Sequence, residues 1–250
     1  LIGTYAYLSQ RRTVAAAADE SENRTIPSFR QMGASFVELC KPQGRDKEIP
    51  LWQDFKVTFW RLFSGLGLSV ALSIVIGLAM GVYAPAEAFF LPTLTFLAKI
   101  PPTAMLALFF VLVGTEYEMY VSMLVFGTLP TLAQAVYQAA KTDVPEELVF
   151  KAYTIGAHHA EVIYNVVLQQ IFPRVLEAIR LTVGPAMVLL IAAEYSGGTG
   201  GGIGFRIRFY FNKVDMTYVY VYVFLLGVAG YAIDYVLAWL RRKLCPWFGD

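Results

Sequence analysis

Five long apolar runs alternate with polar segments along the chain. The hydrocarbon core of a bilayer is about 30 Å thick, and an α-helix needs about 20 residues to cross it. Every run is of that order, and only the fourth carries more than one charged residue. The runs are residues 62–86, 88–115, 119–140, 171–195 and 216–240. We therefore predict five complete transmembrane helices.

A sixth helix is predicted to end within residues 1–12. Leu1–Leu8 is mostly apolar and is followed by Arg11 and Arg12. This stretch has neither the basic start nor the complete apolar core of a signal peptide. We expect the tail of a transmembrane helix whose first part precedes this numbering.

Helix is the expected conformation of all six segments. Tyr218–Val223 alternates Tyr and Val, which locally resembles a strand. However, the run continues past the ~10 residues of a membrane barrel strand without clear turn residues. A long apolar segment in lipid satisfies its backbone groups internally as a helix. The sequence thus predicts an all-α membrane protein of about six transmembrane helices, the first truncated at the N-terminus.

Polar segments define the rest of the organisation. Residues 13–54 contain charges of both signs and three prolines, so we expect them outside the membrane, with a short amphipathic helix within Ser28–Cys40. We predict a transmembrane core over residues 55–240, with a polar connection at 141–172, and a basic tail over 241–250.

The basic tail indicates the orientation. Arg241, Arg242 and Lys243 directly follow the last run, and basic residues beside a span favour the cytoplasm. Counting spans then places the connection at 141–172 in the cytoplasm as well. The basic residues of 13–54 and three more at 206–213 fall outside and argue against this orientation. We expect a cytoplasmic C-terminus.

Composition and motifs exclude several classes of function. Hydrophobic residues make up 57% and charged residues 16% of the chain, against about 25% charged in soluble domains, which indicates a lipid bilayer as the surroundings. The net charge of +1 argues against a nucleic-acid partner. The glycine-rich segment at 196–204 lacks the Gly-Lys-Ser/Thr of a phosphate loop, so we expect no ATP or other cofactor bound directly.

Catalytic and metal sites are not expected either. No paired intramembrane Asp or His, no HExxH and no Ser/His set occurs. Cys40 and Cys245 match no metal-ligand spacing. His158 and His159 are adjacent, so they point to different faces of a helix and make a poor metal pair.

Charged residues within spans mark candidate functional positions, because they are costly in lipid and usually face a partner or a water-lined site. Lys99, Arg180 and Glu194 are such residues, and each can line a water-filled pathway or an interface with a neighbour. Alternatively, each extends to the headgroup region, as long polar side chains do. For Glu194 the second interpretation is favoured, since it borders the polar loop. Asp234 is an available partner for Arg180.

The segment 145–173 is a partly polar, helix-compatible connection between two spans, longer than a bare turn requires. A helix, then Gly156, then a second helix would form a ledge that fits a groove on a partner protein. The alternative is a helix lying in the headgroup region.

This segment resembles the EAA loop of binding-protein-dependent ABC importer permeases. That pattern reads Glu-Ala-Ala, three residues, Gly, nine residues, Ile-x-Leu-Pro. Aligned on Gly156, the chain has Phe150-Lys151-Ala152 at the start and Val166-Val167-Leu168-Gln169 at the end. Ala152, Gly156 and Leu168 match, whereas Phe150 replaces the Glu and Gln169 the Pro.

The flanking sequence is similar to the branch of nitrate, sulfonate, taurine and bicarbonate permeases. The similar segments are 99–104 (KIPPTA), 176–185 (LEAIRLTVGP), 193–194 followed by 200–205, and 244–247 (LCPW), and the resemblance covers about residues 51–247.

The resemblance implies a type I ABC importer permease fold in a bacterial-type inner membrane. It implies two cytoplasmic ATPase subunits, which bind the ATP, a second permease subunit, identical or related, and an extracytoplasmic binding protein that delivers a small anion or small polar organic solute. Residues at the loop would face the ATPase: Phe150, Ala152, Tyr153, Thr154, Gly156, Ala157 and His158. The alternatives are a single-chain secondary transporter or channel, a membrane-embedded enzyme, and a scaffold protein.

Overall fold

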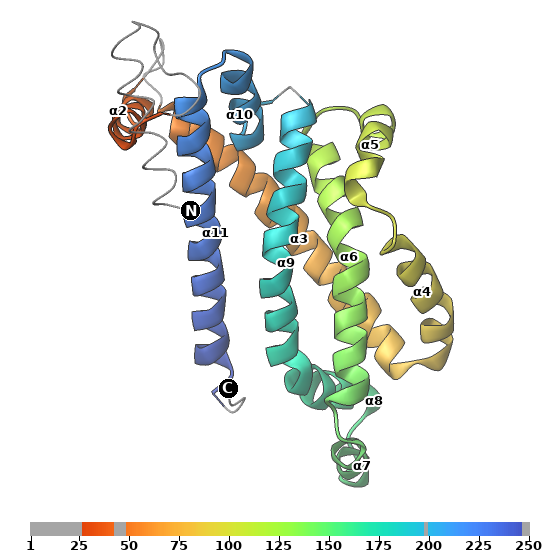
Figure 1. The fold of residues 1–250 in the computed structure, drawn as a ribbon. Helices are drawn as coiled ribbons and strands as arrows, with labels where there is room; N and C mark the ends of the chain where they lie inside the picture. Colours follow the sequence, from red (N-terminus) through yellow and green to blue (C-terminus); the bar gives the residue numbers. More distant parts are fainter. Residues whose placement is uncertain (1–26, 43–48, 198–199, 247–250) are drawn as a thin grey trace, which may run out of the picture. The chain divides into compact units, whose positions relative to one another are not determined.

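The computed structural model describes residues 27–42, 49–197 and 200–246, and helices account for most of them (Figure 1). The elements are α2 (Phe29–Leu39), α3 (Pro50–Val82), α4 (Ala84–Leu97), the 3-10 helix η1 (Pro102–Met105), α5 (Leu106–Leu112), α6 (Tyr117–Thr142), α7 (Glu146–Thr154), α8 (His159–Val162), the π-helix η2 (Ile163–Val167), α9 (Leu168–Gly197), α10 (Ile203–Asn212) and α11 (Met216–Leu244). No strand occurs within the described ranges, which confirms the predicted all-α fold.

Four helices among the described residues are long and apolar enough to cross a membrane. They are α3, α6, α11 and the continuous helix His159–Gly197, which joins α8, η2 and α9. The second apolar run, predicted as one complete span, is instead two helical pieces, α4 and η1–α5, bent by 81° against each other. The sixth helix expected in residues 1–12 lies outside the described residues.

Two adjacent prolines explain the break in the second run. Pro101 is extended, with φ −61° and ψ 119°, and Pro102 stands in the first turn of η1. A proline donates no backbone N–H and disfavours the α conformation of the residue before it, so a helix ends at this pair. Lys99 lies exposed in the turn that precedes the prolines.

The fourth run also differs from the prediction. Its helix begins at His159 instead of residue 171 and passes through the π-helical turn η2. Polar residues such as Asn165, Gln169 and Gln170 hide this start in the hydropathy pattern. The connection at 141–172 is largely helical, as the helix-compatible pattern of 145–173 indicated.

Contacts between residues divide the chain into two compact units. Unit 1 comprises Leu1–Trp60 and Ile191–Ala229, and unit 2 comprises Arg61–Leu190 and Gly230–Asp250. The boundaries fall inside α3, α9 and α11.

In unit 2, α3, α6 and α9 pack closely. Val136 and Ala139 of α6 form a buried cluster with Ile171 and Val175 of α9, and Ile74 and Leu78 of α3 pack against it. Glycine makes the approach of α3 to α6 close: a Cβ on Gly81 would lie 2.5 Å from Cβ of Ala140. Small residues at crossings are typical of membrane helices, which gain little from burying apolar surface against lipid.

In unit 1, α2 is the predicted amphipathic helix, which the structure confirms. It begins at Ser28, whose hydroxyl accepts from Gln31 N–H while the Gln31 side chain accepts from Ser28 N–H. Such a reciprocal cap satisfies two backbone donors that the first turn leaves without partners. Leu39 of α2 is fully buried with Ile203 of α10 and Tyr222 of α11.

Candidate coupling site and intramembrane charges

The turn after α7 has a defined hydrogen-bond pattern around Gly156. Gly156 N–H donates to the Tyr153 carbonyl at 2.9 Å, and Ala157 N–H donates to the Ala152 carbonyl at 3.1 Å. This pair of bonds is a Schellman motif, which ends a helix with a left-handed residue. Gly156 has φ +91°, where an L side chain is strained. Ala152, Gly156 and Ala157, all three predicted to face the ATPase, thus have a structural role in ending α7.

A second cap follows immediately and starts α8. The His158 imidazole Nδ1 accepts from Ala160 N–H at 3.4 Å, and the Glu161 carboxylate accepts from His158 N–H at 2.9 Å. Together the two motifs fix a short helix–turn–helix, as predicted for this segment. His158, predicted to face an ATPase, caps α8 and is exposed.

Large apolar side chains are exposed on α7 and its turn, beside the charged side chains of Glu146, Glu147 and Lys151. No residue of α7 is buried. Phe150 is 65% exposed and Ile155 is 86% exposed, and Leu148 and Tyr153 are exposed as well. Thr154 donates its hydroxyl to the Phe150 carbonyl and stays on the helix surface. We call the four exposed apolar side chains Leu148, Phe150, Tyr153 and Ile155 together the α7 face. They occupy two sides of the helix: Leu148 and Ile155 lie on one, and Phe150 and Tyr153, which border a pocket, lie on the other.

A pocket of about 400 Å³ lies between α7 and the ends of α3 and α6. Its lining includes Gly81 and Val82 of α3, Ala140 and Lys141 of α6, and Tyr153 of α7, together with residues of α8 and η2. Because α7 borders this space instead of filling it, its attachment to α3 depends on particular side chains.

His159 makes that attachment. Its Nδ1 lies 2.5 Å from the Tyr153 hydroxyl, and its Nε2 lies 3.1 Å from the hydroxyl of Tyr83, which separates α3 from α4. The planes of the imidazole and the Tyr153 ring are nearly parallel, 11° apart, with ring centroids 6.2 Å apart. Sequence reasoning treated His159 only as half of a poor metal pair and missed these contacts.

Further ion pairs tie the same end of unit 2 together. Glu87 of α4 accepts from the Tyr137 hydroxyl at 2.6 Å and pairs with Lys141 at 2.9 Å, both on α6. Arg174 of α9 pairs with Asp143, which follows α6, at 3.1 Å. The helices around the pocket are therefore joined by polar contacts as well as by packing.

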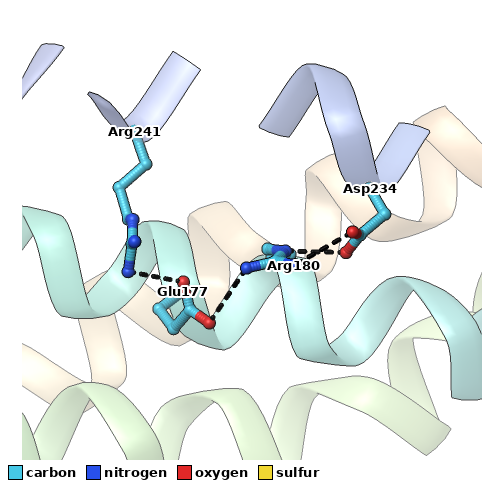
Figure 2. Close-up of polar contacts among 4 residues, drawn as sticks. All are labelled: Glu177, Arg180, Asp234 and Arg241. Atoms are coloured by element: carbon cyan, nitrogen blue, oxygen red, sulfur yellow. Dashed lines mark hydrogen bonds and ion pairs between the residues drawn. The ribbon is translucent and has the colours of Figure 1, made fainter. Parts of the chain in front are cut away.

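Arg180 belongs to a cluster of four charges between α9 and α11, shown in Figure 2. Its Nε and Nη2 donate to the two carboxylate oxygens of Asp234 at 2.7 and 2.9 Å. Glu177 lies 3.5 Å from Arg180 Nη1 and accepts from Arg241 Nη1 at 2.9 Å. The cluster has two charges of each sign, which reduces the cost of placing them in membrane helices. In the sequence, Asp234 is an available partner for Arg180, and the structure shows these two residues paired.

Glu194 differs from the expectation of a side chain that reaches the headgroup region, because it is completely buried. Thr58 Oγ1 of α3 lies 3.0 and 2.9 Å from its two carboxylate oxygens, and Gly204 N–H donates to Oε2 at 3.0 Å. Thr58 Oγ1 in turn accepts from Ile203 N–H at 2.8 Å. Glu194 and Thr58 thus satisfy the first N–H groups of α10 inside unit 1.

The glycine-rich turn before α10 allows this approach. Gly200, Gly201 and Gly202 all have positive φ. A Cβ on Gly202 would lie 2.5 Å from Glu194 Oε1, and a Cβ on Gly204 would lie 2.5 Å from the Ile191 carbonyl oxygen. Residues 200–204 therefore make a tight turn against Glu194 and α9.

A second carboxylate anchors α10 in unit 1. Asp54 is 3% exposed, accepts from Arg206 Nε at 2.8 Å and Nη2 at 3.2 Å, and accepts from the Tyr222 hydroxyl at 2.8 Å. Burial alone would lower the pKa of Arg206, but the hydrogen bonds and charge of Asp54 outweigh it and raise this pKa above its ordinary value. Arg206 therefore stays charged. No sequence pattern predicts the pairing of Asp54 with Arg206, which is 152 residues away.

Among the residues that the structure describes, no group of three or more His, Cys, Asp or Glu is placed to hold a metal ion. Cys40 and Cys245 are free thiols.

These features define a class of protein: a multi-pass helical membrane protein with an exposed helix–turn–helix between two of its spans. The chain belongs to the family of binding-protein-dependent transport system inner membrane components, whose model matches residues 69–246. It is therefore a permease of the ABC importer type and not an enzyme.

Individual relatives agree with the predicted branch. The taurine transport system permease protein TauC of Escherichia coli K12 is 24% identical over 225 residues, which cover 90% of this chain and 81% of TauC. The bicarbonate transport system permease protein CmpB of Synechococcus elongatus is 24% identical over 80% of this chain and 70% of CmpB. The putative aliphatic sulfonates transport permease protein SsuC of Bacillus subtilis is 24% identical over 79% of this chain and 71% of SsuC.

A solved structure shows the same fold. A chain of the MetNI methionine ABC transporter, in an inward-facing conformation, matches with a TM-score of 0.61 and 20% identity, over 78% of this chain and 94% of that chain. This similarity confirms the expected type I importer permease fold.

Proposed function

We propose that this chain forms the solute pathway of an ABC importer and docks a cytoplasmic ATPase subunit through α7, Gly156 and α8. The observation that carries the proposal is the α7 face. Outside the membrane, four exposed large apolar side chains within eight residues are costly unless a partner covers them. The Schellman turn and the α8 cap hold this face in one shape, which suits docking into a groove.

The basic tail supports the proposed orientation. Arg241 pairs with Glu177 near the start of α9, so the C-terminal end of α11 lies at the end of unit 2 from which α9 begins. The α8–η2 segment that follows α7 leads directly into α9. Basic residues at the end of α11 favour the cytoplasm, and the α7 face then lies on the cytoplasmic side.

The assembly we propose contains two permease subunits, identical or related, two ATPase subunits that bind ATP, and an extracytoplasmic binding protein. The family description names binding-protein dependence. The matching relatives are named for taurine, aliphatic sulfonates and bicarbonate, which supports a small anion or small polar organic solute here. Arg180 and Lys99 remain candidates for the pathway or the permease interface. Glu194, buried within its own chain, is instead a structural residue.

The test is co-purification of the ATPase with charged variants of the α7 face. Phe150→Glu and Ile155→Glu place a carboxylate in the proposed interface and should abolish recovery of the ATPase from washed membranes. The matched control is Phe211→Glu, at a phenylalanine that is 48% exposed at the end of α10. It should leave recovery unchanged. If both α7 variants retain the ATPase at the wild-type level, α7 is not the docking element.

A further inference from the structure

We propose that His159 is a positioning residue that links the docking helix α7 to the junction of α3 and α4 at Tyr83. This inference rests on the proposed function of α7. We infer that the ATPase moves α7 and that this movement is transmitted through Tyr153 and His159 to Tyr83. From Tyr83 it reaches the start of α4.

The geometry singles out this route. The α7 helix has no buried residue, and the pocket of about 400 Å³ separates it from the ends of α3 and α6. Among the described residues, the ion pair Lys151–Glu147 and the Thr154 hydrogen bond stay within α7. The Tyr153 hydroxyl instead reaches His159 of α8, and the other nitrogen of the same ring reaches Tyr83.

Both hydrogen bonds can form at once. A neutral imidazole has one N–H donor and one acceptor nitrogen, and a tyrosine hydroxyl can both donate and accept. Either tautomer of His159 is therefore compatible with both tyrosines. The ring is also held between them by contact, with centroids 5.5 Å from Tyr83 and 6.2 Å from Tyr153.

The position of Tyr83 gives the link a consequence. Tyr83 is the extended residue that separates the 33-residue helix α3 from α4, with φ −114° and ψ 113°. It is the point at which the chain leaves one membrane helix and enters the broken span α4–α5. A displacement of the Tyr83 hydroxyl acts at a break between two helices. Helical hydrogen bonds oppose small backbone changes least at such a break.

The experiment uses the full importer in lipid nanodiscs and measures hydrogen–deuterium exchange of residues 80–87, without nucleotide and with ATP plus orthovanadate. We expect the wild type to show a nucleotide-dependent change in exchange. His159→Phe keeps an aromatic ring but removes both hydrogen bonds, and should reduce this change about two- to tenfold while the ATPase stays bound. Tyr153→Phe and Tyr83→Phe should each reduce it less. Tyr164→Phe, at an exposed tyrosine of η2, is the control and should leave it unchanged.

The outcomes separate the link from ATPase docking. If the ATPase stays bound and His159→Phe keeps the full nucleotide-dependent change, or the wild type shows none, the link is refuted and the docking proposal stands. If His159→Phe raises the exchange of residues 80–87 equally with and without nucleotide, the contact is merely structural. This result also refutes the link. If His159→Phe loses the ATPase, the residue shapes the docking surface instead. If the wild type binds no ATPase, the proposed function fails and the link with it.

Discussion

Gly156→Ala is the substitution that tests the shape of the docking element most cleanly. Gly156 has φ +91°, and a Cβ added there would meet no atom within 4 Å. The penalty is therefore purely conformational, about 1–2 kcal/mol for an L residue in the left-handed region. Because α7 has no buried residue to hold it in place, this strain is relieved by local opening of the Schellman turn.

The expected result follows from that energy. A penalty of about 1–2 kcal/mol lowers the ratio of formed to opened turn about 5- to 30-fold, and the apparent Kd for the ATPase rises by up to the same factor. The assay is a binding titration of purified ATPase against the permease in nanodiscs. The apparent Kd of Gly156→Asn should lie between those of the wild type and Gly156→Ala, since Asn adopts the left-handed conformation more readily than Ala.

The matched control is Gly67→Ala. Gly67 lies within helix α3, and a Cβ there would also meet no atom within 4 Å. At an ordinary helical φ, alanine should stabilise the helix by roughly 0.5–1 kcal/mol and leave ATPase binding unchanged. If Gly156→Ala binds the ATPase as tightly as the wild type, the strained turn does not determine the docking geometry and the reasoning is refuted.

Three further predictions concern the packing of the charges and of the glycine-rich turn, and each is tested by thermal unfolding in detergent micelles. Gly204→Ala should destabilise by about 1–3 kcal/mol, because its Cβ would lie 2.5 Å from a carbonyl oxygen; a wild-type Tm would contradict the close approach. Glu194→Leu should lower the Tm more than Glu194→Gln, because leucine removes the acceptor of two buried donors, Gly204 N–H and the Thr58 hydroxyl, at about 1–3 kcal/mol each, whereas glutamine keeps one acceptor oxygen; equal effects would exclude this role. Arg180→Gln alone should lower the Tm more than Arg180→Gln with Asp234→Asn, since the single change leaves a charge unpaired; additive effects would show that the pair is not coupled.

Sequence patterns predicted the spans and the helix–turn–helix because both depend on local properties. Hydropathy locates α3, α6 and α11, and a glycine between two helical segments locates the turn at Gly156. The break at Pro101 was visible as two prolines, but whether prolines kink or end a membrane helix depends on what surrounds them.

The contacts that hold the candidate site together were not predictable in the same way. Tyr83 and His159 are 76 residues apart, and Thr58 and Glu194 are 136 residues apart. Their pairing is decided by how helices pack, which one sequence does not reveal. Glu194 illustrates the difficulty, since its place beside a polar loop favoured an interfacial position, whereas the turn folds back and buries it.

The central claim, that this chain works as the permease of an ATP-driven importer, is tested most directly by the mass and subunit composition of the complex released intact from native membranes. The account predicts a complex with two permease subunits and two ATPase subunits that hydrolyses ATP, and loss of the ATPase when residues 154–159 are deleted. Recovery of this chain alone, in a form that moves taurine or bicarbonate across a liposome membrane without ATP, would contradict it.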